Sequence, residues 1–253
     1  MYVACSTLCF SRMNLPDALR VIREMQFAKA DLAIHESGSH LRPSAVLADV
    51  AKAAAQLKTA NVAFAAFHLE FAEFDSEITR HQLRAVCRLA RTMAVPLVTV
   101  TAAPLGCEAE TEVARLKVWA KLAEIEGVIL TVETRIGTVT EDVSYAADLC
   151  RRVPGLGLTL DPSDFATRNL KEDGCDPLYP FVKHVRLRDS GNKPEQFQLR
   201  IGQGMIEYGR IISQLDRCRY DRALSVDIRD LPDNPFPVEP EIRKLKHLLE
   251  SQV

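Results

Sequence analysis

The chain has 253 residues, of which 47% are hydrophobic and 26% are charged, a composition typical of a globular protein and not of a disordered or fibrous one. Its formal net charge is −2 and it has no basic block, so there is no electrostatic reason to expect a nucleic-acid partner. Its seven cysteines are scattered and form no CxxC pair, which argues against both a disulfide framework and a cysteine zinc site.

The sequence also lacks the patterns of export and membrane insertion. A signal peptide has a basic residue ahead of its apolar part, and the first residues of this chain, MYVACSTLCFSRMNL, have none there. No run of about 18 apolar residues, the length needed to span a bilayer, is found in the chain. We therefore expect a cytoplasmic protein with no membrane partner.

In chain order, short apolar runs of strand length alternate with longer amphipathic stretches of helical periodicity. Residues 43–60 are expected to form one such helix, whereas a shorter and less regular segment that ends near Phe181 follows the sixth run. The runs that we expect to form strands are residues 2–7, 31–37, 61–71, 96–102, 127–135, 155–161, 183–189 and 223–228.

Strands that alternate with helices imply a parallel sheet. Eight such units in 253 residues fit a closed (β/α)₈ TIM barrel, formed by residues 1–253 as a single domain. A doubly wound open sheet is the alternative, but no glycine-rich phosphate loop follows the first strand, as that fold would favour.

Polar side chains share one face of each of the last four predicted strands. Because side chains alternate along a strand, Glu133, Asp161, Arg186 and Asp227 lie opposite aliphatic residues and near the carboxyl ends of their strands. In a barrel these four side chains would converge at the mouth. Burying an unpaired carboxylate is costly, so we expect Asp161 to meet a charge from a neighbouring strand.

Two histidines near the ends of earlier strands are further candidates. His35 lies near the end of the second apolar run and His68 near the end of the third, so either could reach a ligand in the mouth. The alternative is that both are ordinary hydrogen-bonded groups at strand ends. His184 shares the face of Arg186 but lies deeper, where we expect a structural hydrogen bond.

Five segments carry a resemblance to a known family. The chain resembles the sugar-phosphate isomerase/epimerase family with the xylose-isomerase-like TIM barrel, in the superfamily that also holds endonuclease IV. The similar segments are VILTVETRIGT, GLTLDPSDF, VKHVRLRD, IGQGMIEYGRIISQL and ALSVDI.

The resemblance implies a metal-assisted proton transfer next to a carbonyl. It places Glu133, Asp161 and Asp227 at positions that bind a divalent ion, Mn or Mg, with Glu133 and Asp227 as the catalytic pair that takes and returns the proton. The side chains that we expect near the substrate are His35, His68, Arg135, Asp164 and Arg186.

This chain departs from the family at the metal site. Arg186 and Asp164 stand where the family has histidines, Arg135 stands where many members have another, and the final acid is Asp227 instead of glutamate. Arginine cannot bind a metal. Arg186 therefore either turns aside to hold a substrate anion beside a weakened metal site, or replaces the metal with an ion-pair cluster.

Three functions are compatible with these observations. The first is an isomerase or epimerase of a sugar or sugar phosphate, and the second is a catalytically degenerate barrel that binds a polyhydroxylated or anionic small molecule. Abasic-site endonuclease activity is the least supported, because it needs a histidine-rich zinc site and a basic surface. Family resemblance also suggests a homodimer.

Overall fold

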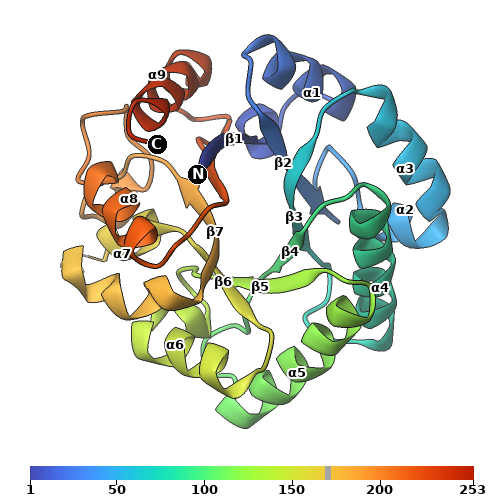
Figure 1. Cartoon of the computed structure of the whole chain (residues 1–253). Helices are drawn as coiled ribbons and strands as arrows, with labels where there is room; N and C mark the ends of the chain where they lie inside the picture. Colours follow the sequence, from blue (N-terminus) through green and yellow to red (C-terminus); the bar gives the residue numbers. More distant parts are fainter. Residues whose placement is uncertain (169–171) are drawn as a thin grey trace.

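The computed structural model describes residues 1–168 and 172–253, and eight parallel strands in it close into a barrel with helices around the outside (Figure 1). Each strand pairs with its neighbours in chain order, and β1 pairs with β8 to close the ring. The expected (β/α)₈ barrel is thereby confirmed. The strands are β1 (Tyr2–Ser6), β2 (Lys29–His35), β3 (Phe64–Glu70), β4 (Leu97–Val100), β5 (Ile129–Glu133), β6 (Gly157–Leu160), β7 (Val182–Leu187) and β8 (Ala223–Val226).

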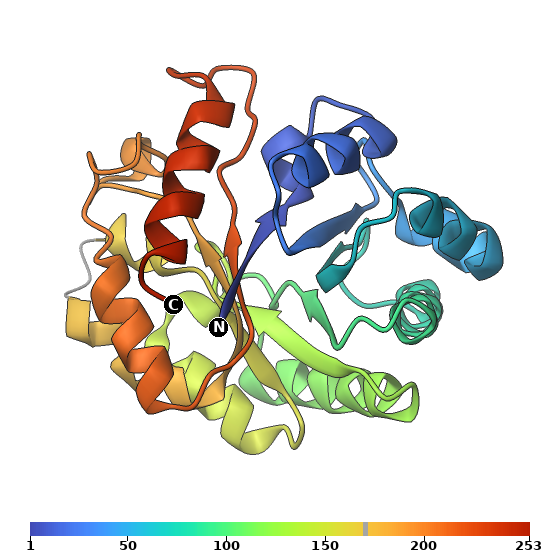
Figure 2. The same ribbon diagram turned by 45° about the horizontal axis from the view of Figure 1, so that its top comes forward.

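Helices form an outer layer around the strands, and the two termini lie close together in both ribbon views (Figures 1 and 2). No helix in the described part of the chain is long and apolar enough to cross a membrane. The α-helices are α1 (Leu15–Glu24), α2 (Pro43–Ala48), α3 (Val50–Thr59), α4 (Glu77–Thr92), α5 (Ala109–Ile125), α6 (Val143–Arg152), α7 (Pro162–Ala166), α8 (Tyr208–Arg217) and α9 (Val238–Glu250). The described residues also contain four 3₁₀ segments: η1 (Thr7–Phe10), η2 (Val139–Glu141), η3 (Glu172–Phe181) and η4 (Pro194–Gln196).

The helix expected over residues 43–60 is divided in two. Asp49 has φ −158° and ψ 93°, which is extended backbone, and it separates α2 from α3. Its carboxylate accepts a hydrogen bond from the backbone N–H of Lys52 at 2.9 Å and so caps α3. Aspartate favours this local bond over a place inside a helix, which the apolar periodicity alone does not reveal.

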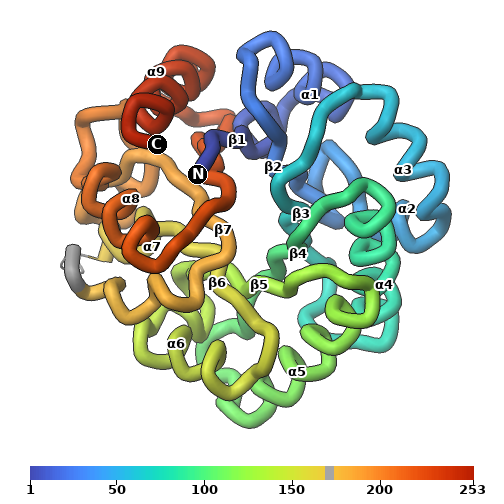
Figure 3. The backbone as a smooth tube through the Cα atoms, viewed as in Figure 1, coloured from blue at the N-terminus to red at the C-terminus, as the bar shows by residue number. Residues whose placement is uncertain are grey.

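The segment after β6 is as irregular as expected. The short α7 follows β6 directly, and η3 leads into β7. Figure 3 traces the backbone of the whole barrel in the view of Figure 1. Residues 169–171, which belong to the segment expected to be less regular, lie outside the described residues.

The alternation of side chains along the strands separates two environments. Leu130 and Val132 of β5 belong to the apolar core between sheet and helices. On the other face, the hydroxyls of Thr99, Thr131 and Thr159 lie within 2.8–2.9 Å of one another and link β4, β5 and β6. These three hydroxyls satisfy each other's hydrogen bonds, so the polar interior needs no solvent at this level.

The loop after β7 is fixed by one aspartate. The Oδ2 of Asp189 accepts hydrogen bonds from the backbone N–H of Gly202 at 2.7 Å and of Gly204 at 3.1 Å. A Cβ on Gly204 would lie 2.1 Å from Asp189 Oδ1, so only glycine allows this approach. The segment IGQG therefore holds the loop close to the mouth of the barrel.

Candidate functional site

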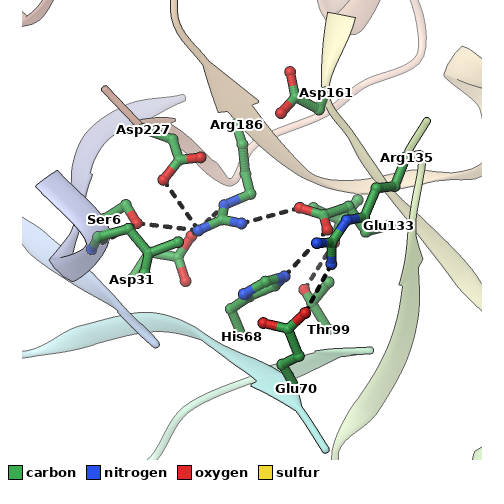
Figure 4. Close-up of polar contacts among 12 residues, drawn as sticks. Ser6, Asp31, His68, Glu70, Thr99, Glu133, Arg135, Asp161, Arg186 and Asp227 are labelled. Atoms are coloured by element: carbon green, nitrogen blue, oxygen red, sulfur yellow. Dashed lines mark hydrogen bonds and ion pairs between the residues drawn. The ribbon is translucent and has the colours of Figure 1, made fainter. Parts of the chain in front are cut away.

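The four polar residues expected to converge come together at the carboxyl ends of four neighbouring strands. Glu133 is the last residue of β5, Arg186 lies in β7, and Asp161 and Asp227 directly follow β6 and β8. All four are at most 1% exposed. Strand parity therefore predicted their location correctly (Figure 4).

Arg186 lies at the centre of this cluster (Figure 4). Its Nη1 donates to Glu133 Oε1 at 2.9 Å, and its Nη2 donates to Ser6 Oγ at 3.0 Å and to Asp227 Oδ1 at 3.1 Å. Its Nε lies 3.4 Å from Asp31 Oδ2. One guanidinium thus contacts three acids from three different parts of the barrel, and each Nη already has an acceptor.

A second arginine, Arg188, holds Asp161. Its Nη2 donates to Asp161 Oδ2 at 2.5 Å and to Asp227 Oδ2 at 2.8 Å, and its Nη1 donates to the Ser163 hydroxyl. The Ser163 hydroxyl donates in turn to Asp161 Oδ1. Asp161 therefore does meet a charge from a neighbouring strand, as expected, but the partner is Arg188.

Both candidate catalytic acids are held in the charged form. Burial by itself would raise the pKa of Glu133, but His68 and Arg186 outweigh that effect and lower it well below its usual range. Burial likewise opposes the ionisation of Asp227, yet Arg186, Arg188 and Arg229 lower its pKa strongly. A carboxylate with a lowered pKa is a weak base, so neither group is suited to take a proton from carbon.

The same contacts decide whether a divalent ion fits. The oxygens of Glu133, Asp161 and Asp227 that would have to coordinate the ion already accept hydrogen bonds from guanidinium groups. Within residues 1–168 and 172–253, no group of three or more His, Cys, Asp or Glu side chains is placed to hold a metal. This arrangement does not fit a divalent ion, and the assignment of the three acids as metal ligands stays a prediction.

A chain of polar contacts leads from Glu133 to the surface. Glu133 Oε2 lies 3.3 Å from His68 Nε2, and His68 Nδ1 lies 2.7 Å from His35 Nε2. His35 Nδ1 is 3.2 Å from Glu70 Oε2, and Glu70 Oε1 accepts a hydrogen bond from Arg135 at 3.1 Å. Burial, then the charges of His68 and Arg186, lower the pKa of His35 well below its usual value, so His35 is neutral at neutral pH.

This series of polar contacts ends in a pocket of about 130 Å³ over the charged cluster, which we call the mouth pocket. It is lined by Leu8, Ser11, His35, His68, Glu70, Arg135, Arg229 and Leu231. Three of the residues expected near a substrate, His35, His68 and Arg135, therefore share one pocket. Arg186 and Asp164 are not among the residues that line it.

Asp164 has a different environment. It lies in α7, is 7% exposed, and its carboxyl group forms no hydrogen bond or ion pair within the described residues. Burial and the nearby charge of Asp161 raise its pKa well above the usual value. Its role as a substrate contact stays a prediction.

Four residues of the site were not singled out from the sequence: Ser6, Asp31, Arg188 and Arg229. Two of them carry a signal in the strand pattern, because Arg188 shares the face of Arg186 and Asp31 shares the face of His35. His184 was expected to form a structural hydrogen bond, and its Nε2 lies 2.9 Å from Asp31 Oδ2.

Solved structures with the same fold include several sugar-converting enzymes and metal-bound barrels. A D-tagatose 3-epimerase-like protein is 18% identical with a TM-score of 0.75, and the match covers 99% of this chain and 98% of that one. A xylose isomerase-like TIM barrel protein from Mycobacterium smegmatis in complex with magnesium is 13% identical with a TM-score of 0.78, covering 99% and 97%. The IOLI protein with a binding zinc atom is 16% identical with a TM-score of 0.75, covering 100% and 99%.

At these identities the structural matches establish the fold alone. A search of curated proteins gives no match. The family model described as xylose isomerase-like TIM barrel matches residues 19–250, which is most of the chain. The chain therefore belongs to the xylose isomerase-like TIM barrel family, whose structural neighbours include sugar epimerases and isomerases.

Proposed function

We propose that this chain binds a small polyhydroxylated molecule with a negative charge, a sugar acid or a sugar phosphate, in the mouth pocket, and that it does so without a divalent metal. The observation that carries the proposal is the position of Arg186. Its guanidinium bonds Glu133 and Asp227, the two acids that the family resemblance assigns to proton transfer.

Replacement of the ion by an arginine changes what the site can do. A metal ion offers open coordination positions to a carbonyl oxygen, whereas Arg186 is fully buried and both its Nη atoms already have acceptors. Glu133 and Asp227 are equally engaged. This supports ligand binding over the metal-assisted isomerisation expected from the family.

The charge of the mouth pocket supports an anionic ligand. Arg229 contributes a half-buried guanidinium whose Nε forms no hydrogen bond within the described residues and lies 3.7 Å from Asp227 Oδ2. Its backbone N–H donates to Gln198 Oε1 at 2.7 Å, which fixes the residue at the edge of the pocket. A positioned arginine suits a carboxylate or phosphate. The imidazoles and carboxylate of His35, His68 and Glu70 supply partners for hydroxyl groups.

Titration calorimetry with glucuronate, glucose 6-phosphate and glucose tests this function. We expect the two anions to bind at least tenfold more tightly than glucose, with the same affinity in EDTA as in manganese. Arg229→Met should weaken anion binding tenfold or more, while Arg243→Met, on the exposed face of α9, should leave it unchanged. Binding that requires manganese, or equal binding of all three compounds, would overturn the proposal.

A second function is favoured by the polar chain from Glu133 through His68 to His35. In this chain of contacts the group that can exchange a proton with a ligand without a metal is the neutral imidazole of His35, which lines the mouth pocket and is hydrogen-bonded to His68. Deuterium incorporation from D₂O into fructose 6-phosphate, followed by NMR, tests this alternative. Incorporation that is lost in His35→Gln would favour an isomerase or epimerase, whereas no incorporation would leave binding as the function.

A further inference from the structure

A second and larger pocket lies beside the mouth pocket and is unused by the proposed function. Its volume is about 400 Å³, compared with about 130 Å³ for the mouth pocket. Glu70 and Arg135 line both, so the two pockets share a wall, and their ion pair is visible in Figure 4. We call this second space the aromatic pocket. A cavity of this size is in the usual range for small-molecule sites.

Stacked planar side chains form the walls of the aromatic pocket. The guanidinium carbon of Arg115 lies 4.2 Å from the ring centres of both Phe74 and Trp119. The rings of Phe71 and Trp119 meet edge to face, with their centres 5.4 Å apart. Flat aromatic walls favour a flat ligand group that can stack or pack against them.

The charge of this wall is already balanced. Arg115 donates to Glu112 Oε2 at 2.7 Å and to Glu112 Oε1 at 2.8 Å, and its side chain is 2% exposed. The Arg115 guanidinium therefore needs no anion from a ligand. The mouth pocket differs in degree, because Arg229 lies 3.7 Å from Asp227 Oδ2 and its Nε has no hydrogen-bond acceptor within the described residues.

Two polar atoms of residues that line the aromatic pocket have no hydrogen-bond partner in the described part of the chain. They are the indole Nε1 of Trp119 and the hydroxyl of Thr101. Trp119 is 1% exposed, and an indole N–H can only donate. Buried donors of this kind are normally satisfied, so the pair indicates a ligand group with a hydrogen-bond acceptor.

Apolar side chains are exposed at the edge of the same pocket. Phe74 is 39% exposed and Ile136 is 40% exposed, and both line the pocket. Covering them with an apolar ligand group would remove this surface from water, which favours binding.

From these features we infer that the aromatic pocket binds a planar aromatic group with a hydrogen-bond acceptor, attached to the same ligand whose polyhydroxylated anionic part occupies the mouth pocket. The ligand class is an aryl glycoside of a sugar acid or an aryl ester of similar shape. This inference rests on the proposed function, because the shared wall of Glu70 and Arg135 places the two parts of one molecule side by side.

The test compares 4-nitrophenyl β-glucuronide with methyl β-glucuronide. Trp119 is the only tryptophan of the chain, so its fluorescence reports directly on the aromatic pocket. We expect the nitrophenyl compound to quench Trp119 and to bind at least tenfold more tightly than the methyl compound in calorimetry. Equal affinities, or tighter binding with no change in Trp119 fluorescence, would overturn the inference while leaving the proposed function intact.

Three variants sharpen the comparison. Phe74→Ala and Trp119→Phe, both measured by calorimetry, should each reduce the ratio of the two affinities threefold or more, the second by removing only the N–H donor and part of the ring. Ile78→Ala, an exposed aliphatic residue on α4 at 48% exposure, is the matched control and should leave the ratio unchanged. An unchanged ratio in both pocket variants would contradict the inference.

Failure of the proposed function can be told apart from failure of this inference by the binding of the two glucuronides. If neither glucuronide binds, the proposed function fails and the linked ligand fails with it. Free 4-nitrophenol then decides the remaining question. Quenching of Trp119 that is lost in Phe74→Ala would retain an aromatic site, and no quenching would exclude it.

Discussion

Arg186 Nη1 and Glu133 Oε1 lie 2.9 Å apart, joining a side chain of β7 to one of β5 across the intervening β6. The same guanidinium reaches Asp227 after β8 and Ser6 in β1. One cation thereby connects strands on different sides of the barrel interior. The stability of the barrel should consequently depend on this side chain.

Arg186→Met tests that dependence. The substitution leaves Asp31, Glu133 and Asp227 buried without their shared cation, and breaking a buried ion pair in this way costs about 3–5 kcal/mol. Urea denaturation should show a loss of this size in the free energy of unfolding. Arg243→Met is the matched control, because its ion pair with Glu239 is exposed and should contribute less than about 1 kcal/mol.

Arg186→His should create a metal site. The variant places an imidazole among Asp31, Glu133 and Asp227, a ligand set that suits Mn²⁺ or Zn²⁺. Manganese at 100 times its dissociation constant would stabilise the variant by about 2.7 kcal/mol, or roughly 5–10 °C in melting temperature. Thermal-shift measurements with and without manganese check this. A variant that binds no metal would contradict the prediction that residue 186 occupies the position of the family's metal-binding histidine.

Acid should weaken the fold through Glu133 and Asp227. Because folding lowers the pKa of both groups, their contribution to stability is fully present above their unfolded values of about 4 and is lost as the pH falls through the folded values. Urea denaturation at pH 7, 5, 4 and 3 should show a steep loss below about pH 4. The loss of stability below pH 4 should be smaller in Arg186→Met. An identical pH profile in both proteins would refute the role of Arg186 in lowering the pKa of Glu133 and Asp227.

Asp164 should show the opposite sign. Its pKa is raised in the folded state, so ionisation opposes folding at neutral pH and the penalty disappears as the pH falls to the unfolded value of about 4. Asp164→Asn is therefore expected to stabilise the protein at pH 7 and to have little effect at pH 4. Asp142→Asn provides the contrast, because its side chain caps α6 and the substitution should give no such pH-dependent gain.

The fold could be predicted because strands alternate with helices along the sequence. The centre of the site could be predicted because side chains alternate between the two faces of each strand. Apolar runs separated by helical stretches specified the eight units, and parity within the runs specified that Glu133 and Arg186 point inward. The break at Asp49 was not predicted, since its extended backbone is stabilised by one local hydrogen bond that hydropathy does not register.

Contacts between distant strands were harder to predict. We expected Glu133, Asp161, Arg186 and Asp227 to share one centre of charge, but Asp161 forms its ion pair with a second arginine, Arg188. The pairing of His35 with His68 depends on the register between β2 and β3, which includes an irregularity next to Asp31. Register of this kind is set by three-dimensional packing and has no direct signal in one sequence. Cytoplasmic location and pairing into a homodimer remain predictions.

The central cation of this barrel is part of the polypeptide. A side chain cannot dissociate, so the acids around Arg186 receive their counter-charge when the strands close. Barrels that depend on a captured ion pass through an empty form whose abundance follows the supply of that element. In this barrel the sequence itself encodes the counter-charge of Asp31, Glu133 and Asp227, so neutralisation of these three acids should not depend on the supply of trace elements.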